Sequence, residues 1–142
     1  MASIRKEIVL HAPANLVWDA LRDVGALHTR LVPGFVVDTR LEPDARVVTF
    51  ASGQVVRELI VDVNEAERRV VWAITDNPFL HYNASAQVFD TPADGCRFVW
   101  VADLLPHELK EHVAAMMDQG LAAIRSTLGG STPATELQSQ GR

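Results

Sequence analysis

The chain of 142 residues is 48% hydrophobic and 22% charged, a globular composition with enough apolar side chains for one substantial core. Its net charge is −5 at pH 7 and its pI is about 5.4, which excludes the basic surface that nucleic acids or anionic membranes attract. No apolar run exceeds five residues, whereas a membrane-spanning helix needs about 20, so we expect no membrane span.

The first part of the chain predicts one strand followed by two short helices. Residues 3–11 alternate between more and less apolar positions, as a strand does. Pro13 suits the first turn of a helix, and Val17, Leu21 and Val24 follow it at helical spacing. Because Gly25 interrupts this pattern, we expect a helix of about three turns and then a second, shorter helix that ends near Leu31.

The middle of the chain predicts an antiparallel meander. Six segments alternate in hydropathy and are separated by short turns rich in Gly, Pro, Asp and Asn: 35–41, 46–51, 54–63, 69–75, 81–90 and 97–104. Strands joined by such short turns pair antiparallel. Ser52-Gly53 predicts a tight two-residue hairpin.

The last element is a long helix. Apolar residues recur at helical spacing from Pro106 until Gly129-Gly130, over about 22 residues or roughly 33 Å, which is long enough to cover a sheet. Residues 1–130 are therefore expected to form a single domain. Residues 131–142 contain one large apolar residue, Leu137, and are expected to form a mobile tail.

Motifs for metals, nucleophiles and phosphates are missing from the sequence. The single cysteine, Cys96, excludes an internal disulfide and multi-cysteine metal sites. The sequence contains no HExxH, GxSxG or glycine-rich phosphate loop, so we predict no metal and no cofactor. The first 11 residues carry Arg5, Lys6 and Glu7 and lack the apolar stretch of a signal peptide, which predicts a cytoplasmic protein.

Three local motifs in this order resemble the SRPBCC superfamily, and most of all its polyketide cyclase/dehydrase-like proteins. They are residues 12–21 (APANLVWDAL), the segment Val56-Arg57-Glu58-Leu59 followed by Asp62 and Arg69, and residues 94–100 (DGCRFVW). The resemblance implies an α+β helix-grip fold, in which a seven-stranded antiparallel curved sheet wraps around a long C-terminal helix, with two short helices after the first strand. It also implies a ligand cavity between the sheet and the helix.

The sequence favours a cavity at that place for a second reason. One face of strand 81–90 carries small side chains, and the helix opposite carries a glycine, so this region is either a filled core or a void lined by aromatic rings. We predict that the ligand contacts Trp72, Tyr82, Ala84, Ala86, Phe98, Trp100, Met116, Met117 and Gly120, together with Arg57 or Glu58.

Arg57 and Glu58 are adjacent strand residues, so only one of them can face the cavity. A two-residue Ser52-Gly53 turn would pair Val48 with Arg57 and place Arg57 on the more apolar face, where it could receive a carboxylate or enolate. The resemblance favours an acidic residue inside, and an inward Glu58 could orient a ligand or act as a base. Alternatively, either charge lies near the sheet edge, paired across the strands.

The polar row His81, Asn83, Ser85 and Gln87 is expected on the outer face of its strand. If the two faces were exchanged, this row would line the cavity and His81 would become an acid/base candidate beside Glu58.

Three hypotheses of function follow. The first is binding or carriage of a small, mostly apolar molecule such as a lipid, a polyketide or an aromatic metabolite. The alternative is an aromatase/cyclase-like enzyme that acts on a polyketide-type substrate by acid/base chemistry. The third is an interaction protein with a vestigial cavity. The sequence does not predict the oligomeric state.

Overall fold

The computed structural model describes residues 2–129, and these form one antiparallel sheet with helices on one of its faces. The strands are β1 (Ala2–Leu10), β2 (Val36–Glu42), β3 (Ala45–Phe50), β4 (Val55–Asn64), β5 (Arg69–Ala73), β6 (His81–Thr91) and β7 (Gly95–Leu105). They form a seven-stranded sheet in the order β1-β7-β6-β5-β4-β3-β2, so the predicted meander and the helix-grip fold are confirmed.

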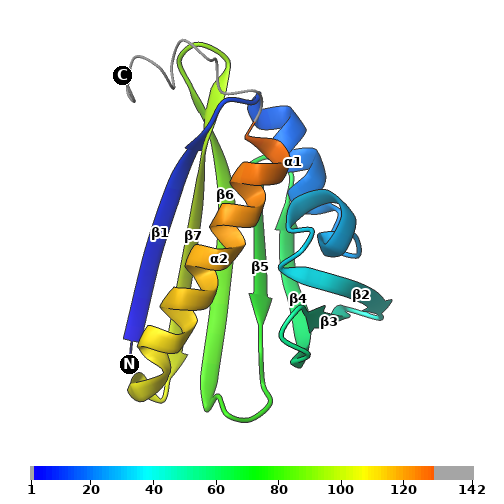
Figure 1. The fold of residues 1–142 in the computed structure, drawn as a ribbon, viewed down its shortest axis with the longest axis vertical. Coiled ribbons are helices and arrows are strands. Elements are labelled where there is room, and N and C mark those ends of the chain that lie inside the picture. The colour runs from blue at the N-terminus through cyan, green and yellow to red at the C-terminus, as the bar shows by residue number, and fades with distance from the viewer. Residues whose placement is uncertain (1, 130–142) are drawn as a thin grey trace.

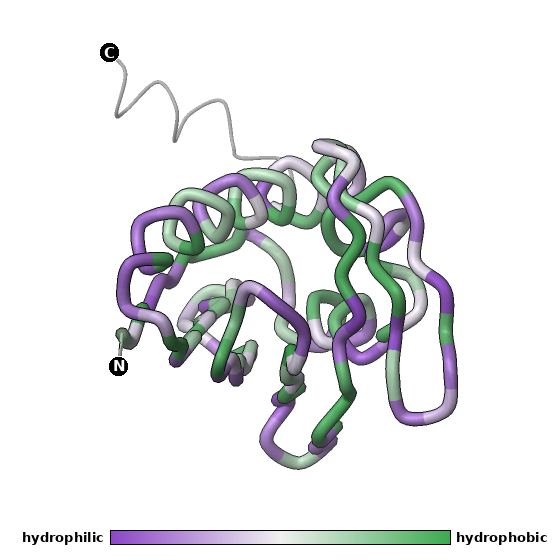
Figure 2. The backbone as a smooth tube through the Cα atoms, turned by 90° about the horizontal axis from the view of Figure 1, so that it is seen from below, coloured by the Kyte–Doolittle hydropathy of each residue, from purple (hydrophilic) through white to green (hydrophobic). Residues whose placement is uncertain are grey.

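The long C-terminal helix lies across the inner face of this sheet (Figure 1). A short 3₁₀ turn, His107–Leu109, leads into helix α2, Lys110–Leu128. Figure 2, turned by 90°, shows the sheet curving around this helix. The predicted helix therefore lies where expected, but its first turn has the tighter 3₁₀ geometry, as is common at helix ends.

Two short helical segments follow β1 and lie on the same face as α2. Helix α1 (Ala14–Arg22) follows Pro13 and buries Val17, Trp18 and Leu21. The second segment, η1 (Leu27–Leu31), is one turn of π-helix. Gly25, between them, allows close contact with β2, because a Cβ atom at Gly25 would lie only 2.7 Å from Cγ of Leu41.

Alternation along the strands fixes which side chains face α2. On β6, Tyr82, Ala84 and Ala86 are buried on the inner face, whereas His81 is exposed on the outer one. The predicted tail, residues 131–142, lies outside the described residues, and the single domain of residues 1–130 stays a prediction. Within residues 2–129, no helix is both long and apolar enough to cross a bilayer.

Candidate ligand-binding cavity

A mostly apolar cavity of about 110 Å³ lies between the inner face of the sheet, α2 and η1. For comparison, an apolar cavity of about 150 Å³ holds a benzene molecule. Eight of the expected ligand contacts line it: Glu58, Trp72, Tyr82, Ala86, Phe98, Trp100, Met116 and Met117. The space therefore suits a group about as large as one ring.

A buried ion pair interrupts this apolar lining. Nε of Arg46, on β3, donates a hydrogen bond to Oε1 of Glu58, on β4, at 2.7 Å. The two side chains are only 4% and 9% exposed. The guanidinium also donates to the carbonyl of Val24 at 3.3 Å and lies 5.3 Å from the ring centre of Trp72. These contacts hold both charges in place at the cavity wall.

Tyr82 adds a third ionisable group to the same wall. Its ring packs against Phe79, with 4.8 Å between the ring centres. Burial, together with the negative charge of Glu58, raises the pKa of Tyr82 well above its ordinary value. The phenol therefore keeps its proton at neutral pH and can donate a hydrogen bond.

Two polar atoms of this wall remain available to a ligand. Within residues 2–129, the Tyr82 hydroxyl and Oε2 of Glu58 have no hydrogen-bond partner. Neither atom is completely buried. Among the described residues, the polar side-chain atoms that are both completely buried and without a hydrogen-bond partner are Nδ1 of His28, Oγ1 of Thr39 and Nε1 of Trp100. The cavity thus offers one donor and one acceptor close to a guanidinium.

The predicted register of the β3–β4 hairpin is wrong by one residue. Arg57 pairs with Val47 rather than Val48, and Glu58 pairs with Arg46. The turn has three residues, 51–53, because Phe50 N–H donates to the carbonyl of Gln54 and Gly53 has a φ of +93°. A shift of one residue exchanges the two faces of a strand.

As a result, Glu58 faces the cavity and Arg57 does not. Arg57 lies on the outer face of the sheet, where its Nε donates to Oε1 of Glu42 at 2.8 Å. Of the other expected contacts, Ala84 and Gly120 are buried beside the cavity without lining it. A Cβ atom at Gly120 would lie 2.8 Å from Cζ3 of Trp100, so this glycine lets the indole lie against α2.

Arg46 was not among the residues expected at the cavity. A signal was present, because Arg46 shares a face of its strand with Val48 and Phe50, and both of these are buried. His81, by contrast, is exposed and lies away from the cavity. Within the described residues, no three His, Cys, Asp or Glu side chains come together as a metal site.

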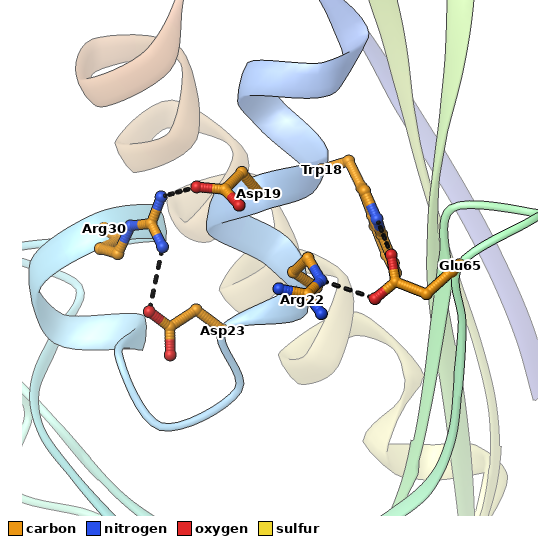
Figure 3. Close-up of polar contacts among 6 residues, drawn as sticks. All are labelled: Trp18, Asp19, Arg22, Asp23, Arg30 and Glu65. Carbon is orange, nitrogen blue, oxygen red and sulfur yellow. Dashed lines mark hydrogen bonds and ion pairs between the residues drawn. The ribbon is translucent and has the colours of Figure 1, made fainter.

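A surface network fixes the two short helical segments that close the cavity (Figure 3). Nε1 of Trp18 and Nε of Arg22 donate to the two carboxylate oxygens of Glu65, at 2.8 and 2.6 Å. These hydrogen bonds lower the pKa of Glu65. Beside these contacts, a separate pair of salt bridges joins Arg30 to Asp19 and Asp23. The network thereby holds the elements that supply Leu21, Leu27 and Leu31 to the cavity wall.

Residues 1–129 match the protein family described as "Polyketide cyclase / dehydrase and lipid transport". Among curated proteins, none matches the sequence.

Solved structures share the fold at low sequence identity. The protein XoxI from Bacillus cereus is 17% identical, with a TM-score of 0.81 over 90% of this chain and 96% of that one. The di-domain ARO/CYC BexL from the BE-7585A biosynthetic pathway is 15% identical, with a TM-score of 0.76 over 89% of this chain and 46% of that one. Norcoclaurine synthase from Thalictrum flavum is 22% identical, with a TM-score of 0.62 over 84% and 83%. At these identities, the likeness shows the fold alone.

Proposed function

Because the chain belongs to the family of polyketide cyclases, dehydrases and lipid-transport proteins in the SRPBCC superfamily, we propose that it binds a small, mostly apolar molecule between the sheet and α2. The observation that carries this proposal is a mostly apolar space with one wall that carries the polar groups of Arg46, Glu58 and Tyr82. Ligand sites commonly combine an apolar lining with a few placed polar groups. The ligand is therefore a ring or chain of lipid, polyketide or aromatic type that carries one polar group.

The polar wall favours a ligand with a carbonyl group. The Tyr82 hydroxyl donates to the carbonyl oxygen, and the Arg46 guanidinium favours negative charge on it. A purely hydrocarbon ligand would cover the same polar atoms without replacing their hydrogen bonds to water, which costs free energy.

Filling the cavity tests the binding proposal. The assay is a titration of acetophenone, followed by ligand-observed NMR, with the wild type and two tryptophan variants. Ala86 faces the cavity, so Ala86→Trp should remove binding while the variant still melts cooperatively. Ser85 lies on the opposite face of the same strand, so Ser85→Trp should bind as the wild type does. Equal binding by all three proteins would refute a cavity site.

The same wall supports a second candidate function, an aromatase/cyclase-like reaction. Oε2 of Glu58 would remove a proton from the carbon next to a ketone, while Tyr82 and Arg46 stabilise the enolate oxygen. The enolate carbon would then form a bond to a second ketone carbon of the same chain, and loss of water would complete the ring. The specific support is that a free carboxylate oxygen and a protonated phenol face one cavity.

The rate at which a small diketone closes to a ring distinguishes a carrier from an enzyme. 2,6-Heptanedione closes to 3-methylcyclohex-2-enone and water, and ultraviolet absorbance follows the product. A cyclase would accelerate this reaction, and Glu58→Gln would remove the acceleration, whereas Glu42→Gln on the outer face would retain it. A carrier would bind the diketone and leave its rate unchanged.

A further inference from the structure

A second hollow adjoins the cavity at the surface. The cavity measures about 110 Å³, and the adjoining groove measures about 440 Å³. Five side chains line both spaces: Phe35, Phe50, Gln54, His112 and Met116. Only these side chains need to move for a ligand in the cavity to extend into the groove.

The groove has two walls. One is a stripe along α2 formed by His112, Met116, Gln119 and Ala123. These positions recur at helical spacing over 11 residues, which corresponds to a length of about 16 Å along the helix. The other wall consists of residues 33–35, between η1 and β2, and of Phe50, Ala51, Ser52 and Gln54 in the β3–β4 hairpin.

The chemistry of the groove differs from that of the cavity. Its polar side chains are Ser52, Gln54, Gln119 and His112, and the remainder of its lining is apolar or glycine. Among the described residues, no Lys, Arg, Asp or Glu lines it. A carboxylate or phosphate lying there would lose water without gaining a lysine or arginine partner, whereas an amide, alcohol or ether could hydrogen-bond to the two glutamines and the serine.

We propose that this groove holds the uncharged tail of an elongated ligand whose compact apolar end occupies the cavity. The inference rests on the proposed binding function and adds the class of ligand to it: a ring-sized head, a tail that extends along α2, and neutral hydrogen-bonding groups on that tail. Gln119 and Ser52 lie on opposite walls and hydrogen-bond to the neutral polar groups of the tail.

The test compares the affinities of three probes that share a phenyl head. Ethylbenzene has the head alone, 8-phenyloctan-1-ol adds a neutral tail, and 8-phenyloctanoate adds an anionic tail. Because the tail buries further methylene groups in the groove, the alcohol should bind the wild type at least about tenfold more tightly than ethylbenzene. The carboxylate should gain less than the alcohol.

Tryptophan substitutions on α2 test whether the gain in affinity from the tail arises in the groove. Gln119 and Ala122 are both exposed helix residues, and only Gln119 lines the groove. In Gln119→Trp the affinity ratio of alcohol to ethylbenzene should fall towards one, and in Ala122→Trp it should remain at the wild-type value. Ser52→Trp, which blocks the groove from the hairpin side, should repeat the effect of Gln119→Trp.

Failure of this inference is distinct from failure of the binding proposal. If ethylbenzene binds the wild type but the ratio is the same in all variants, or if the carboxylate binds as tightly as the alcohol, the groove does not hold a neutral tail and the cavity site stands. If acetophenone does not bind the wild type, or binds Ala86→Trp as well as the wild type, both proposals are overturned.

Discussion

Replacing Glu58 by glutamine would leave the Arg46 guanidinium buried without a countercharge. The guanidinium would keep its hydrogen bond to Val24 and its contact with Trp72, but neither carries a negative charge. Removing one partner of a buried ion pair costs about 3–5 kcal/mol of folding free energy, because the other charge stays desolvated. With the side chain of Arg46 only 4% exposed, we expect Glu58→Gln to lose about 3 kcal/mol or more.

The outer face of the sheet provides a matched control. Arg57 and Glu42 form a cross-strand pair at 2.8 Å, almost the same length, but their side chains are 44% and 31% exposed. An ion pair with that exposure is worth about 0–1 kcal/mol. Glu42→Gln should therefore cost at most about 1 kcal/mol, although it removes the same chemical group from a contact of similar geometry.

A double substitution distinguishes the contribution of the two charges to stability from that of side-chain packing. In Arg46→Met/Glu58→Leu both charges are replaced by apolar side chains, which is often neutral or stabilising for buried pairs, so most of the lost stability should return. Urea denaturation of the four proteins gives the free energies of unfolding. If Glu58→Gln costs no more than Glu42→Gln, water in the cavity hydrates Arg46, and our reasoning about an enclosed pair is wrong.

Three further predictions concern the elements around the cavity. Gly120→Ala places a Cβ atom 2.8 Å from the Trp100 ring, so it should destabilise the protein by about 1–3 kcal/mol and weaken acetophenone binding. If the variant has the same melting curve and the same titration curve as the wild type, this prediction is wrong. The pKa of Glu65 is lowered by its hydrogen bonds to Trp18 and Arg22, so the stability this carboxylate contributes is present above its ordinary pKa and is lost as the pH falls through the lowered value. Melting temperatures between about pH 7 and pH 3 should therefore fall less steeply in Glu65→Gln than in the wild type, and parallel curves would exclude this contribution. A chain that ends at Leu105 lacks α2, the cover of the inner sheet face, and should aggregate; cooperative melting of a soluble form in calorimetry would contradict the role of the helix.

Much of the fold could be predicted because its signals are local. Along β6, buried and less buried residues alternate, and this period of two placed Tyr82 and Ala86 inside and His81 outside. After Pro106 the period changes to that of a helix, which marked α2 as the cover of the sheet. Each of these signals depends on neighbours in the chain and on the burial of one face.

The polar wall of the cavity could not be predicted in the same way, because it depends on pairing between strands. The residue types of β4 show only that one of Arg57 and Glu58 faces inward. Which one does so depends on whether the β3–β4 turn has two or three residues. A three-residue turn that ends with Gly53 at positive φ places Arg46 opposite Glu58.

Arg46 and Glu58 can both be buried because each side chain neutralises the charge of the other. A lone glutamate on the inner face of β4, or a lone arginine on that of β3, would be buried without a countercharge, which folded proteins rarely allow. The three-residue turn sets these two charges directly opposite each other, so one bond of 2.7 Å neutralises both. A turn one residue shorter would direct Arg57 inward and Glu58 outward, and the cavity would lose its carboxylate oxygen. The length of this hairpin turn therefore determines whether β4 presents a carboxylate or a guanidinium to the ligand, and a comparison of the polar wall among relatives should begin at that turn.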